Sequence, residues 1–377
     1  MKVVYLARWY PHKYDPMFGL FVQRHAEAAA LHNDITVIYV HPDENATHRY
    51  DIERTTENGV DTIRIYYKKK GKVSSIWRYF RACLKGLKLA GKTDLIHVHV
   101  LTRMGFFAHW QKYLNGTPYL ITEHWSRYLP GNDFSGFLHK MWTKKIVRRA
   151  AMVTTASEVL AEAMRSHGLR NSRYRLLPNV VDTNLFKPIP HHNDVPKIVH
   201  VSCFEDKSKN ISGLLESLKM MKDKSIAFQA VLIGEGMDLE AMKQRACDLG
   251  ITDCVRFTGL LQGQALVDEL ATGDFFVLPS HYETGGIVLL EALACGLPVV
   301  ATNVGALPEI VNEQNGILVP DGDAKALAEA MQQCCHTYYN YNLEELRNPV
   351  VERYSKEAVG KLLDEWYGEI THRRCSS

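Results

Sequence analysis

The sequence predicts two α/β domains, each built on a parallel sheet that helices cover on both faces. Short runs rich in β-branched and aromatic residues alternate with segments of helical periodicity through both halves of the 377-residue chain. A stretch with three prolines and no periodicity, FKPIPHHNDVP at 186–196, separates the two series. A chain of this length also fits two domains better than one core.

Five strands are expected in each series. They are KVVYLA (2–7), ITVIYV (35–40), DLIHVHV (94–100), PYLIT (118–122) and MVTTA (152–156), then KIVHVS (197–202), FQAVLIG (228–234), VRFTG (255–259), DFFVLPS (274–280) and PVVAT (298–302). We therefore predict doubly wound, Rossmann-like domains over 1–188 and 197–352. An amphipathic helix at 355–370, within a C-terminal segment 353–377, is expected to cross back to the first domain.

Composition excludes several classes of protein. With 46% hydrophobic and 23% charged residues, the chain is typical of globular proteins. Its longest apolar segment is interrupted by Glu291, and the amino-terminal apolar run ends at Arg8, so neither a membrane span nor a secretory signal is expected. Eight cysteines without C-x-x-C spacing suggest neither a zinc site nor a disulfide framework. We expect a cytoplasmic protein.

Charge is distributed unequally along the chain. Residues 1–190 contain 29 Lys and Arg against 15 Asp and Glu, whereas residues 191–377 contain 16 against 27. A basic half can meet nucleic acid, an anionic membrane or an acidic small molecule. We expect no nucleic-acid partner, because no zinc-finger, RNP or helix-turn-helix pattern accompanies the charge.

The segment 274–302 carries the most chemical information. After a predicted buried strand come Glu283, Gly285 and Gly286, and then a helix that contains Glu291. The bare helix start offers the amides of Gly286, Ile287 and Val288 to a phosphate. Glu291 is placed to accept the hydroxyls of a ribose attached to that phosphate. A solvated Glu283 beside a simple glycine turn is the alternative, but Glu291 inside an apolar helix would be costly without a partner.

The run PSHYETGGIVLLEALACGLPVVATNVGALPEIV closely resembles the signature of retaining glycosyltransferases of family 4. Further similar segments are VTTASEVL, RLLPNVVDTNLFKP, KNISGLLESL, LIGEGMDLEAMK and VRFTGLL, so the resemblance covers most of residues 150–320. It implies the GT-B fold, with two Rossmann-like domains facing each other across a cleft. It also implies transfer of a hexosyl group from a nucleotide diphosphate-sugar, such as a UDP- or GDP-sugar, with retention and without a metal or other cofactor.

The resemblance also assigns roles in the second, donor-binding domain. Glu291 matches the residue that holds the ribose, Glu283 the one that holds hydroxyls of the donor sugar, and Lys209 a cation for the diphosphate. Cys203 stands where the family has an arginine, so Lys207 is a candidate substitute for the lost charge. Gly234 and Gly236, between a strand and a helix, are expected to line the nucleotide pocket.

In the first, acceptor-binding domain, the resemblance points to the ends of two strands. Gly19 matches a glycine loop that approaches the donor phosphate, and a plain turn is the alternative. His124 matches a histidine that faces the donor sugar and the reaction centre. Glu123, Trp125 and Arg127 beside it are expected to shape the acceptor pocket.

Residues 68–92 contain nine Lys and Arg and no acid, and from Ser74 they show helical spacing. The predicted apolar face holds Ile76, Phe80, Cys83, Leu84 and Leu87; the cationic face includes Arg78, Arg81, Lys85 and Lys88. One interpretation is a crossover helix with a solvated cationic face. The other is a surface that docks on anionic lipid at the inner face of the cytoplasmic membrane and gives access to a lipid-linked acceptor.

Two other functions remain open. A nucleotide-sugar epimerase shares the two-domain fold and would convert the donor without an acceptor. A catalytically silent scaffold that binds nucleotide-sugar is suggested by Cys203 in the arginine position. The leading hypothesis is a glycosyltransferase that acts on a glycan or lipid-linked acceptor in polysaccharide or glycoconjugate biosynthesis.

Overall fold

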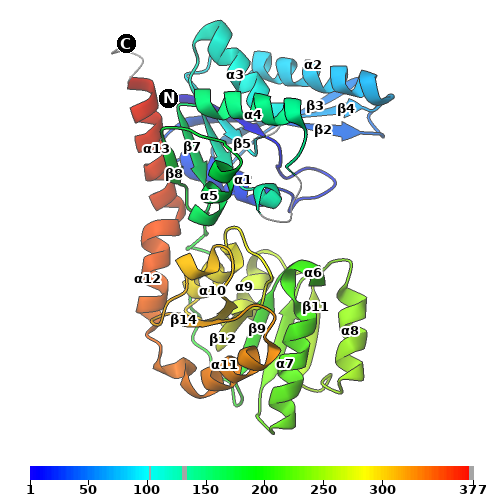
Figure 1. Ribbon diagram of the computed structural model, residues 1–377, viewed down its shortest axis with the longest axis vertical. Helices are drawn as coiled ribbons and strands as arrows, with labels where there is room; N and C mark the ends of the chain where they lie inside the picture. Colours follow the sequence, from blue (N-terminus) through cyan, green and yellow to red (C-terminus); the bar gives the residue numbers. More distant parts are fainter. Residues whose placement is uncertain (102, 130–133, 373–377) are drawn as a thin grey trace. The chain divides into compact units, whose positions relative to one another are not determined.

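The computed structural model describes residues 1–101, 103–129 and 134–372, and the last five residues of the predicted C-terminal segment lie outside this part. The chain divides into two compact units, each an α/β structure (Figure 1). Unit 1 comprises Met1–Val180 with Lys356–Ser377, and unit 2 comprises Val181–Ser355. In both units a helix lies between most successive strands, as the periodicity predicts.

The sheet of unit 1 has eight strands in the order β3-β4-β2-β1-β5-β6-β7-β8. Their bounds are β1 (Lys2–Ala7), β2 (Asp34–Asp43), β3 (Tyr50–Glu57), β4 (Val60–Lys68), β5 (Leu95–His99), β6 (Tyr119–Glu123), β7 (Met152–Thr155) and β8 (Tyr174–Leu176). The sheet is parallel, as predicted, except at one edge, where β3 pairs antiparallel with β4. Asn58 and Gly59 have φ values of 50° and 80°, which suit a two-residue hairpin turn.

Helices cover both faces of this sheet. They are α1 (Leu20–Ala29), α2 (Lys72–Ala90), α3 (Arg103–Asn115), α4 (Phe137–Arg149), α5 (Glu158–Ser166) and α13 (Lys356–His372), with the short helix η1 (Ser126–Tyr128). Buried residues of α2 to α5 share a core with Val4 and Val98, whereas those of α1 and α13 share a second core with Val3 and Tyr5. Neighbouring strand residues point to opposite faces, so one strand supplies both cores.

The basic helix α2 packs on the sheet largely through the predicted face: Cys83 is buried, and Phe80, Leu84 and Leu87 pack partly buried against the core. Its buried residues are Tyr79, Ala82, Cys83, Gly86 and Ala90. Ile76, which was predicted on the apolar face, is 58% exposed, and Trp77 beside it is 60% exposed. Gly86, which was not predicted to face the sheet, allows the helix to approach Ile38 closely.

Although it ends the described chain, α13 belongs to unit 1 and packs on α1 (Figure 1, red helix). Its buried Tyr367 hydroxyl lies 2.7 Å from the Tyr5 hydroxyl and 2.8 Å from Nδ1 of His97. His97 Nε2 contacts the Thr122 hydroxyl at 2.6 Å. This polar chain links α13 to β1, β5 and β6 inside the core.

Unit 2 has a six-stranded parallel sheet in the order β11-β10-β9-β12-β13-β14. The strands are β9 (Lys197–Val201), β10 (Gln229–Ile233), β11 (Val255–Gly259), β12 (Phe275–Leu278), β13 (Val299–Thr302) and β14 (Gly316–Val319). The helices are α6 (Asp206–Lys209), α7 (Ile211–Asp223), α8 (Leu239–Asp248), α9 (Gly263–Ala271), α10 (Ile287–Ala294), α11 (Ala324–Thr337) and α12 (Leu343–Tyr354), with η2 (Leu307–Glu309) and η3 (Tyr338–Asn340). The cores on the two faces of the sheet contain α7, α8 and α11 on one side and α9, α10 and α12 on the other.

Strand order places the candidate site residues at one edge of each sheet. In unit 2 the first strand, β9, lies between β10 and β12, and in unit 1 the first strand, β1, lies between β2 and β5. Where the order reverses in this way, the loops after neighbouring strands diverge and leave room for a ligand. Among the described residues, no helix is both long enough and apolar enough to cross a lipid bilayer.

The Tyr367 network generates a stability prediction. Replacing Tyr367 with Phe keeps the ring and removes the hydroxyl that the buried Tyr5 and His97 contact. We expect a loss of about 1–3 kcal/mol in the free energy of opening, because buried polar groups are left without a partner. Hydrogen exchange should quicken in β5 and α13 but not in β9 of unit 2. The matched control is Tyr339→Phe at a 69% exposed position, and equal protection in both variants would contradict the proposed network.

Candidate functional site

An ion pair joins the loop after β9 to the loop after β12. Nζ of Lys209, the last residue of α6, lies 2.8 Å from Oε2 of Glu283. Oε1 of Glu283 accepts hydrogen bonds from the amides of Thr284, Gly285 and Gly286 at 3.1, 3.4 and 3.4 Å. Two residues that the sequence analysis placed around a donor, Lys209 and Glu283, therefore contact each other directly.

The two partners hold each other charged. Burial works against the negative charge of Glu283, but the Lys209 ammonium and the amides of Gly285 and Gly286 outweigh it and lower the pKa of the carboxyl group. Burial likewise works against the charge of Lys209, and the Glu283 carboxylate raises the pKa of Lys209. Both groups are therefore ionised near neutral pH.

Helix α10 begins immediately after this loop. Gly286 precedes it in the left-handed conformation, with φ 55° and ψ 33°. Ile287 and Val288 form its first turn, where the amides have no acceptor within the helix itself. Glu291 is only 4% exposed and lies on the same helix among buried apolar residues. The helix thus combines a positive dipole end with a buried carboxylate one turn further on.

Close backbone contact fixes the position of Glu283. A Cβ on Gly305 would lie 1.9 Å from the Glu283 carbonyl oxygen, so only glycine fits there. That same oxygen accepts a hydrogen bond from the Ala306 amide at 3.0 Å. The sequence analysis missed Gly305 as a positioning residue, although it lies in the run NVGALPE of the family signature. His281 donates its amide to the Ser208 carbonyl at 2.9 Å and brings the loops together a second time.

The glycine loop after β10 packs against the loop that contains Cys203. A Cβ on Gly234 would lie 1.8 Å from the Ser202 carbonyl oxygen, and one on Gly236 would lie 2.5 Å from that of Phe204. Packing within the chain therefore requires both glycines. Their predicted place in the nucleotide pocket stays a prediction.

The other candidates in this region lie nearer the surface. Cys203 and Lys207 are exposed, whereas Lys209 is half-buried. Lys209 is therefore the lysine that the fold fixes in place. Lys207 is an exposed cation on the same short helix, α6.

In unit 1, His124 follows the carboxyl end of β6 and joins a cluster of histidines. Its ring lies 4.5 Å from that of Phe21, 5.5 Å from that of His25 and 5.8 Å from that of His99. Burial, with a smaller contribution from His25, lowers the pKa of His124, and burial lowers that of His99 as well. Within the described residues, buried Nε2 of His124 and both ring nitrogens of His99 have no hydrogen-bond partner. Neutral imidazoles with buried, unpartnered nitrogens therefore lie at this strand end.

One nitrogen from each of His25, His99 and His124 lies within 4.8 Å of the others, a spacing that a metal ion could use. The two nitrogens of His25, however, face the carbonyl oxygens of Phe21 and Pro178 at 2.8 and 2.9 Å. This leaves His25 poorly suited as a ligand, because a ligand nitrogen needs a free lone pair. In unit 2, Asp321 and Asp323 form a D-x-D sequence, a spacing that a metal ion could also use. Both carboxylates already have partners within the chain, because Asp321 contacts His281 and Asp323 caps α11. The absence of a metal stays an expectation.

Glu123 holds its own loop. It is fully buried, and its carboxylate accepts the amides of Leu101, His124 and Trp125 at 2.9, 2.9 and 3.0 Å. Burial raises the pKa of this carboxyl group, although the hydrogen bonds from the three amides act to lower it. Its oxygens therefore position the segment after β6, and its predicted part in shaping an acceptor pocket stays a prediction. Trp125 and Arg127, half-buried on that segment, stack at 4.5 Å.

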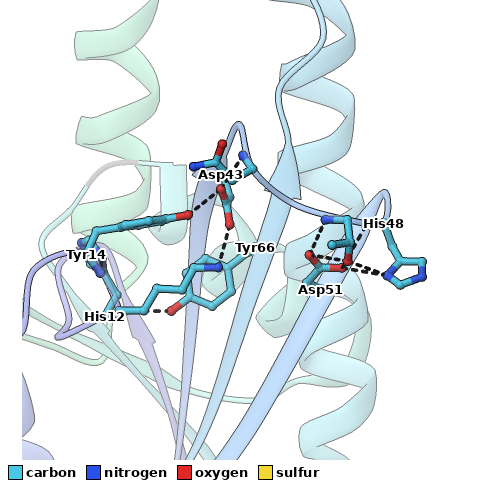
Figure 2. Close-up of polar contacts among 9 residues, drawn as sticks. His12, Tyr14, Asp43, His48, Asp51 and Tyr66 are labelled. Atoms are coloured by element: carbon cyan, nitrogen blue, oxygen red, sulfur yellow. Dashed lines mark hydrogen bonds and ion pairs between the residues drawn. The ribbon is translucent and has the colours of Figure 1, made fainter.

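The loop that leads to Gly19 is fastened to β2. Figure 2 shows the Tyr14 hydroxyl donating to Asp43 at 2.7 Å, and Lys13 pairs with the same carboxylate at 2.8 Å. Gly19 precedes α1 with φ 70°, and a Cβ there would lie 2.4 Å from the backbone of Trp9. A contact within the chain thus accounts for this glycine. Its approach to a donor stays a prediction.

Two family models match the chain. The model described as Glycosyltransferase Family 4 matches residues 21–185, and the one described as Glycosyl transferases group 1 matches residues 195–337. The chain is 28% identical over 294 residues to the sulfoquinovosyl transferase SQD2 of Arabidopsis thaliana, covering 73% of this chain and 53% of that protein. It is 27% identical over 249 residues to a phosphatidyl-myo-inositol mannosyltransferase of Mycobacterium leprae, covering 64% of each. The chain thus spans less than two thirds of either relative.

Solved structures agree on the fold. Sucrose-phosphate synthase from Thermosynechococcus elongatus superposes with a TM-score of 0.80 at 21% identity, over 99% of this chain and 100% of that one. Anabaena HepE in complex with UDP gives 0.76 at 17% identity, over 98% and 100%. With both halves of the chain matched, the protein belongs to the family 4, or group 1, glycosyltransferases and has their GT-B fold.

Proposed function

We propose that this protein is a retaining hexosyltransferase that uses a UDP- or GDP-sugar as donor and a hydroxyl of a glycan or lipid-linked molecule as acceptor. The observation that carries the proposal is the Lys209–Glu283 pair beside the start of α10, with Glu291 buried on that helix. A nucleoside diphosphate needs positive charge and N–H donors at its diphosphate, and a hydrogen-bond acceptor at its ribose hydroxyls. The fixed cation and the amides at the helix start suit the diphosphate, and the buried carboxylate suits the ribose. Both named relatives are glycosyl transferases.

Each donor group would then have its own partner in unit 2. Lys209 and the amides of Ile287 and Val288 neutralise the diphosphate as it leaves, which lowers the barrier without a metal ion. Glu291 accepts the ribose hydroxyls, and Glu283 accepts hydroxyls of the donor sugar. The departing diphosphate oxygen takes the acceptor proton, so no protein side chain is needed as general base.

In this proposal, unit 1 contributes His124 and binds the acceptor. His124 is assigned a hydroxyl of the donor sugar, with its buried Nε2 unpartnered among the described residues. The exposed Val73, Ile76 and Trp77 of α2, beside exposed Arg81, Lys85 and Lys88 and partly exposed Arg78, suit a peripheral contact with anionic lipid. The proposed setting is the inner face of the cytoplasmic membrane, with no nucleic-acid partner.

A panel of UDP-, GDP- and ADP-sugars, scored for nucleotide release with and without an extract of lipid-linked acceptors, tests the proposal. Release that depends on acceptor is the expected result and identifies the donor. Sugar conversion without acceptor would indicate an epimerase. Nucleotide binding without release would indicate a scaffold. Such a protein would be consistent with the exposed Cys203 at the position where the family has an arginine.

Glu291 should recognise the ribose specifically. In Glu291→Ala, binding of the nucleotide diphosphate should weaken about 10- to 100-fold, because the ribose hydroxyls lose a charged acceptor. Calorimetry with the matching 2′- and 3′-deoxyribonucleotides sharpens the test: wild type should discriminate against them, and the variant should not. Glu329→Ala, at an exposed position of α11, serves as control. Unchanged discrimination in Glu291→Ala would disprove the assigned role.

His124 should act as a neutral donor. Because burial lowers its pKa, His124 takes up a proton only below the usual histidine range, and activity should fall only there. We therefore expect kcat/KM to stay level from about pH 6 to 8. His124→Gln, which keeps an N–H, should retain more activity than His124→Ala. An acidic limb centred between pH 6 and 7 that disappears in His124→Gln would contradict a neutral His124.

A further inference from the structure

An open pocket of about 770 Å³ lies in unit 1 among the end of β1, α3, the η1 segment and α4. Its volume is in the range of small-molecule sites. Three arginines line it, Arg8, Arg103 and Arg127, and none of its described lining residues is acidic. The remaining wall is largely aromatic and aliphatic, with Phe106, Trp125 and Trp142 as its large members.

The arginines present one side of the pocket as a site for an anion. Arg8 and Arg103 are exposed, and the Arg103 guanidinium lies 5.6 Å from the ring centre of Tyr79. Arg127 lies 4.5 Å from the ring centre of Trp125 and 5.4 Å from that of Phe134, which fixes its position. Planar guanidinium groups match phosphate oxygens better than any other side chain. The positive charge of Arg127 also acts on His139 in the pocket wall. Burial, and to a smaller extent Arg127, lower the pKa of His139.

The opposite side offers apolar surface to solvent. Leu138 is 66% exposed, Trp142 43% and Phe106 39%, although all three line the pocket. Large apolar side chains gathered around a hollow typically mark a binding site. A free inorganic anion would gain nothing from this wall, and a neutral lipid would gain nothing from the arginines.

We propose that this pocket binds the acceptor, and that the acceptor is an amphiphile in which a phosphate or diphosphate joins an apolar chain to a head group that bears the accepting hydroxyl. The phosphate lies against Arg8 and Arg103, and the chain lies along Phe106 and Trp142. Trp125, which lines the pocket, directly follows His124, so an occupant of the pocket lies beside the segment that carries this histidine. This inference rests on the proposed function and specifies its acceptor.

Binding of farnesyl diphosphate to the full chain, in detergent-free buffer, tests the proposal by calorimetry. We expect it to bind at least about tenfold more tightly than either inorganic diphosphate or farnesol, because only the amphiphile uses both sides of the pocket. Arg103→Ala and Trp142→Ala should each weaken binding about tenfold or more. Arg148→Ala and Phe137→Ala, exposed residues of α4 outside the pocket wall, are the matched controls.

Equal binding of inorganic diphosphate would reduce the pocket to an anion site, and equal binding of farnesol would reduce it to an apolar groove; either result overturns the proposal. Equal affinity in the pocket variants and their controls would overturn it as well. UDP and GDP binding, measured on the same samples, should be the same in all four variants. If farnesyl diphosphate binds as expected while no nucleotide binds, the proposed function fails and the pocket assignment stands.

Discussion

The ion pair between Lys209 and Glu283 is the contact on which the candidate donor site depends. It connects the loop after β9 with the loop after β12, at the point where the strand order of unit 2 reverses. A half-buried lysine without a carboxylate would carry a desolvation cost, and so would Glu283 without Lys209. Each is kept charged by the other, and Glu283 in addition binds the amides that precede α10. Positive charge and helix start are therefore held together before any ligand arrives.

The candidate residues of unit 1 are organised by a different constraint, the burial of uncharged polar groups. His97, His99 and Thr122 lie in the core at the carboxyl ends of β5 and β6. Tyr367 of α13 closes this chain of polar groups from the far end of the sequence. Glu123 holds the next segment by three amides. The consequence is a rigid strand end on which His124 and Trp125 are positioned with little freedom.

Much of this arrangement could be predicted from local sequence. All ten strands expected from alternating periodicity are present, although β3, β4, β8 and β14 were not expected. The run around Glu283 identifies both carboxylates and the helix that carries Glu291. The antiparallel strand β3 was missed although Asn58 and Gly59 are a standard hairpin signal, because its outward face is polar and lacks the apolar pattern of a core strand. Helical periodicity identified most of the buried face of α2, but it placed the exposed Ile76 there and did not reveal that Gly86 lets the helix approach Ile38. Contacts such as Gly305 with Glu283, or Tyr367 with His97, join distant parts of the chain and leave no local pattern.

The central claim is that the fixed Lys209, and not the exposed Lys207, is the cation that receives the donor diphosphate. Calorimetry of the nucleoside diphosphate and of the uncharged nucleoside, on wild type, Lys209→Ala and Lys207→Ala, tests it most directly. Loss of a charge-assisted contact in Lys209→Ala should weaken the diphosphate about tenfold or more and leave the nucleoside unaffected, with Lys207→Ala close to wild type. Equal diphosphate affinity in wild type and Lys209→Ala, or a similar loss for the uncharged nucleoside, would contradict the account.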